Sequence, residues 1–119
     1  MACVVPDAEG RKRLMQGIYD GVKAGNLQLA HQCFSKVAQR LAAAHGVDTL
    51  VMACTEIPLG LGVKESLCAS GSLVPGGVEL IGSGLSGLRL VDPAVYLARA
   101  LANRAYARHS PHQLPCAAN

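Results

Sequence analysis

A continuous apolar run at residues 48–53, Asp-Thr-Leu-Val-Met-Ala, most constrains what this chain can fold into. It has the length of a strand and follows a helix-patterned segment through a glycine turn at Gly46. Runs of this kind are typical of strands that are buried on both faces of a parallel sheet. Cys54 stands at the carboxyl end of the run, where open α/β sheets bind their ligands.

Two other short apolar runs, residues 2–5 and 88–91, are predicted to be strands of the same sheet. Pro6 ends the first run because proline removes an amide donor. Residues 62–87 are rich in Gly and Ser, which predicts a long loop to which no function is assigned. Residues 109–119 are expected to be a disordered tail.

Apolar residues recur at helical spacing in three segments, which predicts three helices. The segments are residues 14–22, 29–41 and 97–105. Gly25 and Gly46 are expected to close the first two helices, and Asp92-Pro93 to begin the third. Because strands alternate with helices, we expect residues 1–108 to form one α/β domain with three layers around a small parallel sheet.

The composition argues against several classes of function. The formal charge of +3 is spread along the chain and only 3% of the residues are aromatic, so no nucleic-acid site is predicted. The five cysteines form no CxxC pair and the four histidines lack ligand spacing, so no metal site is predicted. Free thiols and the lack of a long apolar run lead us to expect a soluble, cytoplasmic protein without a membrane span.

Cys54, Thr55 and Glu56 bring together groups that can move a proton. Backbone amides at the start of a helix are expected to give the Cys54 thiol thiolate character, so that it acts as a base or nucleophile. Thr55 offers a hydroxyl and an amide to a ligand carboxylate, and Glu56 can orient or deprotonate a neighbouring donor. Taken alone, these residues more often indicate an inert core cysteine followed by a turn.

Four motifs occur in order between about residues 3 and 107. They are Val4-Val5-Pro6-Asp7, Ile18-Tyr19-Asp20 with Gly25, Cys54-Thr55-Glu56-Ile57-Pro58, and Val91-Asp92-Pro93 leading to Leu97-Ala98-Arg99-Ala100. Together they resemble the carboxyl-terminal half of the cofactor-independent aspartate/glutamate racemase family. The resemblance implies a flavodoxin- or Rossmann-like half of a two-domain enzyme that uses neither pyridoxal phosphate nor metal.

The resemblance also implies roles for individual residues. Cys54 matches the second of two catalytic cysteines, Glu56 the acidic residue beside it, and Thr55 a residue that holds the amino-acid substrate. A substrate-binding lysine of the family has Lys23 as its nearest candidate. Glutamate racemases usually have a histidine in place of Glu56, so the resemblance points to the aspartate-type or a broader branch.

The family's other cysteine lies in a Cys-Asn-Thr motif that this chain does not contain. Inversion needs an acid and a base on opposite faces of the α-carbon. We therefore expect a fragment, a homo-oligomer or a chain that a separate amino-terminal domain complements. Two alternatives remain open: a non-catalytic domain that self-associates, and a related enzyme such as a hydantoin racemase, maleate isomerase or arylmalonate decarboxylase, against which Glu56-Ile57-Pro58 argues.

Overall fold

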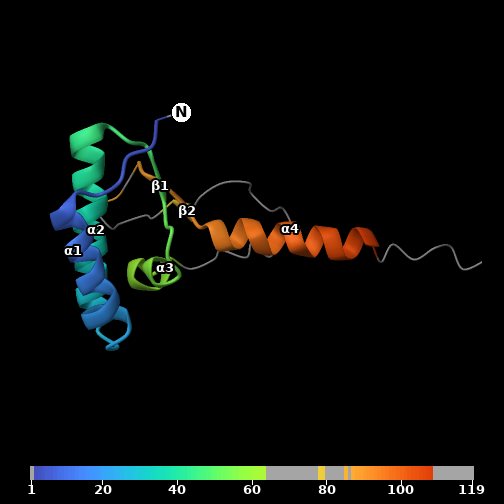
Figure 1. The fold of residues 1–119 in the computed structure, drawn as a ribbon, viewed down its shortest axis with the longest axis horizontal. Helices are drawn as coiled ribbons and strands as arrows, with labels where there is room; N and C mark the ends of the chain where they lie inside the picture. Colours follow the sequence, from blue (N-terminus) through green and yellow to red (C-terminus); the bar gives the residue numbers. More distant parts are fainter. Residues whose placement is uncertain (1, 64–77, 80–84, 86, 109–119) are drawn as a thin grey trace, which may run out of the picture.

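The computed structural model describes residues 2–63, 78–79, 85 and 87–108 (Figure 1). Most of the predicted loop at 62–87 and the whole predicted tail at 109–119 lie outside the described residues. The elements, in chain order, are α1 (Ala8–Gln16), the π-helix η1 (Gly17–Val22), α2 (Leu27–His45), β1 (Thr49–Val51), α3 (Glu56–Leu61), β2 (Val78–Glu79), β3 (Arg89–Val91) and α4 (Pro93–Arg108). The described chain is therefore a mostly helical domain with a small sheet.

The helices begin and end at residues whose chemistry explains the boundary. Asp7 caps α1 by accepting a hydrogen bond from the amide of Gly10 at 2.8 Å, and Asn26 caps α2 through the amide of Leu29 at 3.1 Å. Gly46 ends α2 in the left-handed conformation with φ of 62°, as the sequence predicts. Asp92 accepts from the amide of Ala94 at 2.9 Å and so caps α4.

Phe34 of α2 lies at the centre of the core, where three glycines approach it or its neighbour Ala30. A Cβ at Gly17 would lie 2.5 Å from the Phe34 ring, and a Cβ at Gly21 would lie 2.9 Å from the backbone nitrogen of Ala30. A Cβ at Gly60 would overlap the same ring. These glycines weaken their own helices but let η1 and α3 pack closely against one stretch of α2.

The sheet has the strand order β1-β3-β2. β1 and β3 are parallel, with Leu50 opposite Leu90, whereas β2 runs antiparallel to β3. Leu90 is buried in the core and Leu50 packs against it, so this face of the sheet meets the helices. The expectation of a parallel sheet holds for the pairing of β1 with β3. It is wrong for β2, which is antiparallel to β3.

Residues 2–5 are not a strand in the structure, which corrects the prediction made from their apolar run. The segment is exposed, with Val5 at 70% of its accessible surface. An apolar run indicates only that a segment would gain by burial, and a strand also needs a neighbouring edge to pair with. The Val4-Val5-Pro6-Asp7 motif instead leads directly into the cap of α1.

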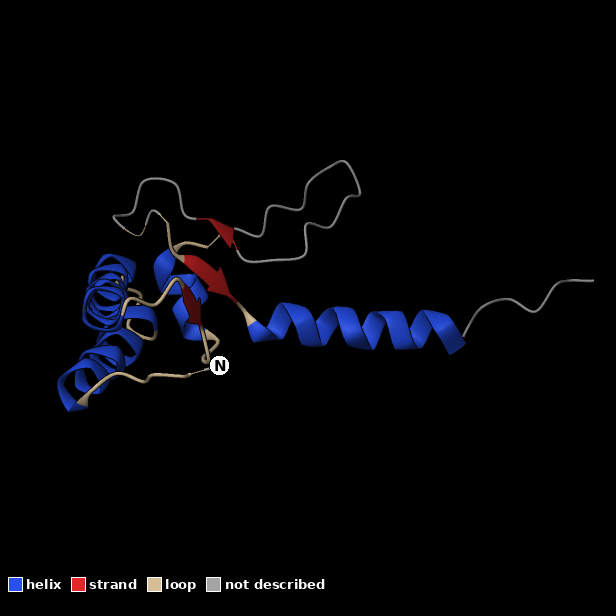
Figure 2. Ribbon diagram, turned by 90° about the horizontal axis from the view of Figure 1, so that it is seen from above, coloured by secondary structure: helices blue, strands red, loops and turns tan. Residues whose placement is uncertain are grey.

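The expected third layer is also absent from the described residues. In Figures 1 and 2, α1, η1, α2 and α3 gather at one end of the molecule, and α4 extends away from the sheet. Leu97 and Leu101, which belong to the apolar spacing of the predicted helix at 97–105, are 62% and 60% exposed. Only one residue, Asp92, separates β3 from α4. This short connection carries the helix outward instead of back across the sheet.

Candidate functional site

The Cys54 loop leaves the sheet at the carboxyl end of β1. The ladder continues to Met52, whose amide donates to the carbonyl of Val91 at 2.8 Å. The chain then bends, and α3 begins at Glu56, with the amide of Ile57 donating to the carbonyl of Cys54 at 3.3 Å. Cys54 is thus located where the sequence predicts, in the turn between a strand and a helix.

The side chains of Cys54, Thr55 and Glu56 meet at a single carboxylate oxygen. The Cys54 thiol donates to Oε2 of Glu56 across 2.8 Å. The Thr55 hydroxyl donates to the same oxygen across 2.9 Å. Three consecutive predicted site residues therefore form one hydrogen-bonded cluster, at a position that is partly buried around the sulfur.

The protonation states of this cluster follow from its contacts. Burial, and then the hydrogen bond to Glu56, raise the pKa of Cys54 above its ordinary value. Hydrogen bonds from the backbone amides of Glu56 and Ile57 act in the opposite direction but are outweighed. The expected thiolate character is therefore wrong for this structure, and the thiol is neutral at pH 7.

Glu56 shows the complementary shift. Hydrogen bonds from Cys54, Thr55 and its own amide lower the pKa of Glu56, and the charge of Lys23 lowers it further. Glu56 consequently stays ionised and serves as an acceptor. The resting cluster is a neutral thiol held against a carboxylate.

The charge of Lys23 lowers the pKa of Glu56 less than the hydrogen bonds do, and η1, which precedes Lys23, packs against α3. Lys23 follows the last residue of η1, and its amide donates to the carbonyl of Ile18 at 2.9 Å. Its ammonium nitrogen lies 4.7 Å from the centre of the Tyr19 ring. Sequence reasoning did not assign a role to Tyr19, although its spacing of four residues from Lys23 in a helical segment was a usable signal.

The other buried cysteine has a different environment. Cys33 lies within α2 in the hydrophobic core, and its sulfur is 3.9 Å from the side-chain oxygen of Gln16. Cys33 therefore acts as a small buried apolar residue of the core. Among residues 2–63, 78–79, 85 and 87–108, no three His, Cys, Asp or Glu side chains are grouped so that they could hold a metal ion.

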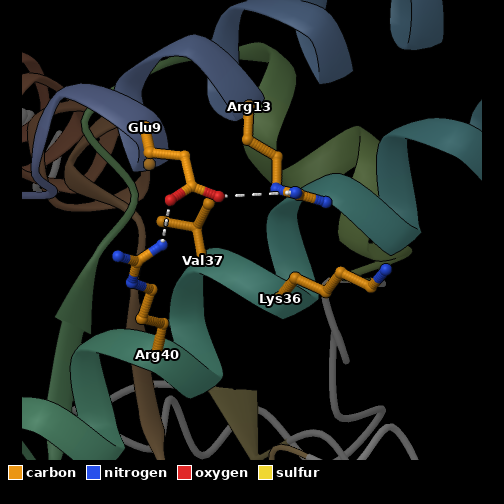
Figure 3. Close-up of a pocket in the computed structure, with 6 residues that line it drawn as sticks. Glu9, Arg13, Lys36, Val37 and Arg40 are labelled. Atoms are coloured by element: carbon orange, nitrogen blue, oxygen red, sulfur yellow. Dashed lines mark hydrogen bonds and ion pairs between the residues drawn. The ribbon is translucent and has the colours of Figure 1, made fainter.

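A shallow hollow of about 200 Å³ lies between α1 and α2 and is lined by residues other than those of the Cys54 loop (Figure 3). Arg40 donates to Glu9 and to Asp7, at 2.8 Å each, and Arg13 lies 3.8 Å from Glu9. These exposed ion pairs neutralise both carboxylates and join the two helices. The hollow is therefore explained by helix packing.

No protein-family model matches the chain, and no solved structure matches it significantly. None of the helices in the described parts is long and apolar enough to cross a membrane. A function for this chain therefore depends on the chemistry of the Cys54 cluster and on the four sequence motifs.

Proposed function

We propose that this chain is the Cys54-bearing half of a cofactor-independent amino-acid racemase of the aspartate/glutamate type. The observation that carries the proposal is the 2.8 Å contact between the Cys54 thiol and the Glu56 carboxylate at the carboxyl end of β1. It joins the two residues that the racemase-like motif would assign to proton transfer. Thr55, whose hydroxyl donates to the same Glu56 oxygen, and Lys23, whose charge acts on Glu56, are the residues that we assign to substrate binding.

Cys54 acts as the acid or base on one face of the α-carbon. In its thiol form it delivers its proton to a carbanion at Cα and becomes a thiolate. In the reverse direction the thiolate removes the α-proton, the C–H electron pair stays on carbon, and the thiol is restored. The neighbouring Glu56 carboxylate disfavours the thiolate, so the thiolate is a stronger base once it has formed.

Inversion needs a second acid or base on the opposite face of Cα. The other cysteines in the described part of the chain are Cys3, which is exposed, and Cys33, which is buried in the core. Among the described residues, neither has a hydrogen bond to a carboxylate like that of Cys54. The second group is therefore proposed to come from another domain or another copy.

The test follows deuterium at Cα when the chain is incubated with L-aspartate or L-glutamate in D2O. It is run with and without an amino-terminal domain that carries a Cys-Asn-Thr motif. Incorporation that disappears in Cys54→Ser but persists in Cys33→Ser supports the proposal. A lack of deuterium in both amino acids, with and without the added domain, contradicts it.

A second candidate function, a self-associating domain without catalysis, is favoured by the exposed apolar side chains of α4. Leu97 and Leu101 lie one helical turn apart and are both largely exposed. Val51, on the sheet face that points away from the core, is 61% exposed. A second copy would remove these surfaces from water.

Light scattering coupled to size-exclusion chromatography separates the two candidates. Self-association through α4 predicts a dimer that Leu101→Arg converts to a monomer. Asn103→Arg adds the same charge on the opposite side of α4 and should leave the dimer intact. A wild-type chain that is monomeric at all concentrations excludes this second candidate.

A further inference from the structure

Tyr19 of η1 and Lys23, the residue after η1, form a cation–aromatic pair, and η1 packs against α3, the helix that begins at Glu56. The ammonium nitrogen lies 4.7 Å from the ring centre, within the range in which a ring face attracts a cation. A carboxylate partner would neutralise the lysine, whereas a ring leaves its positive charge and N–H donors available. The pair therefore restrains a long, flexible side chain without removing its ability to bind an anion.

Glycine contacts in the core position the helical elements around this pair. Gly21 of η1 packs against the backbone of Ala30, and Gly60 of α3 packs against Ala30 and the Phe34 ring. The element that carries Tyr19 and the element that begins at Glu56 thus meet the same stretch of α2 and each other. Hydrogen bonds from Cys54, Thr55 and the Glu56 amide are the main causes of the lowered pKa of Glu56, and the charge of Lys23 adds to them.

We propose that Tyr19 is a positioning residue that holds the ammonium group of Lys23 ready for the carboxylate of an amino-acid ligand at Cys54. This inference rests on the proposed racemase function and extends it to a residue outside the Cys54 loop. The ligand class is an amino acid with a free α-carboxylate. The ring, and not the hydroxyl of Tyr19, performs the positioning.

Protection of Cys54 from iodoacetamide by L-aspartate tests the inference, with alkylation followed on the Cys54 peptide by mass spectrometry. Wild-type protein should be protected. Tyr19→Leu should raise the half-protecting aspartate concentration about two- to five-fold, the effect expected of an exposed cation–aromatic pair. Tyr19→Phe keeps the ring and should behave like wild type, and Lys23→Met should show the largest loss.

Two controls separate positioning from a general structural effect. Lys36→Met removes an exposed lysine from α2 and should leave protection unchanged. The alkylation rate of Cys54 without aspartate should be the same in Tyr19→Leu as in wild type.

Equal protection of Tyr19→Leu and wild type would overturn the proposed role of Tyr19 and leave the proposed function in place. A loss in Tyr19→Phe as large as in Tyr19→Leu would assign the effect to the hydroxyl and also overturn it. If aspartate fails to protect even the wild-type protein, both this inference and the proposed function are contradicted.

Discussion

The thiol of Cys54 lies 2.8 Å from a carboxylate oxygen of Glu56, a residue only two positions further along the chain. The tight turn from β1 into α3 makes this contact, so no distant element is needed to assemble it. Burial and then this contact raise the pKa of Cys54, and the contact lowers the pKa of Glu56. It therefore sets the protonation state from which any chemistry at Cys54 must begin.

Replacement of Glu56 by glutamine should make Cys54 more reactive near neutral pH. The substitution removes the negative charge that raises the pKa of Cys54, so a larger fraction of the thiol is ionised. The pH midpoint of iodoacetamide alkylation should move to lower pH. Glu9→Gln, which removes a carboxylate that pairs with Arg40, is the matched control and should leave the midpoint in place. An unchanged midpoint in Glu56→Gln would show that Glu56 does not control the thiol.

The stability of the fold should depend on the ionisation of Cys54. Its pKa is raised on folding, so its contribution is fully present below the pKa of the unfolded thiol and is lost as pH rises through the folded pKa. The unfolding free energy of the wild type should therefore fall relative to that of Cys54→Ser as the pH rises into the alkaline range. Urea unfolding at several pH values measures it, and a difference that grows in favour of the wild type would reverse the assigned direction.

Gly60→Ala should destabilise the domain by about 1–3 kcal/mol, the usual cost of overpacking a core. The added methyl group would overlap the ring of Phe34. In a Phe34→Leu background the ring is gone, so Gly60→Ala should cost less there than in the wild type. Unfolding free energies of the four proteins give the coupling between the two sites. Strictly additive costs would mean that the two residues do not meet.

The sequence predicted the local features of this fold better than the long-range ones. Gly46 and Asp92 end and begin helices as expected, because capping depends on a few neighbouring residues. Cys54 follows β1 for the same reason. Apolar residues predict a strand at 2–5 and, at 97–105, a helix of a three-layer domain. Apolar character does not specify which element a segment packs against, and both segments are mostly exposed.

The electrostatics of the site show a similar division. The motif brought Cys54, Thr55 and Glu56 together by their adjacency in the chain. The direction of the Cys54 pKa shift was predicted wrongly, because it depends on the balance between burial, a carboxylate contact and backbone amides. Such a balance requires side-chain positions. The pairing of Tyr19 with Lys23 needed them as well.

We propose that Cys54 is one of two acid/base groups and that it serves a single face of the α-carbon. This proposal is tested most directly by incubating the chain alone with each enantiomer of aspartate in D2O, followed by chiral separation and mass spectrometry. Deuterium should appear at Cα in one enantiomer only, with retained configuration and at a rate that rises with pH, and Cys54→Ser should show no exchange. Interconversion of the enantiomers by the chain alone, or exchange that survives in Cys54→Ser, would contradict it.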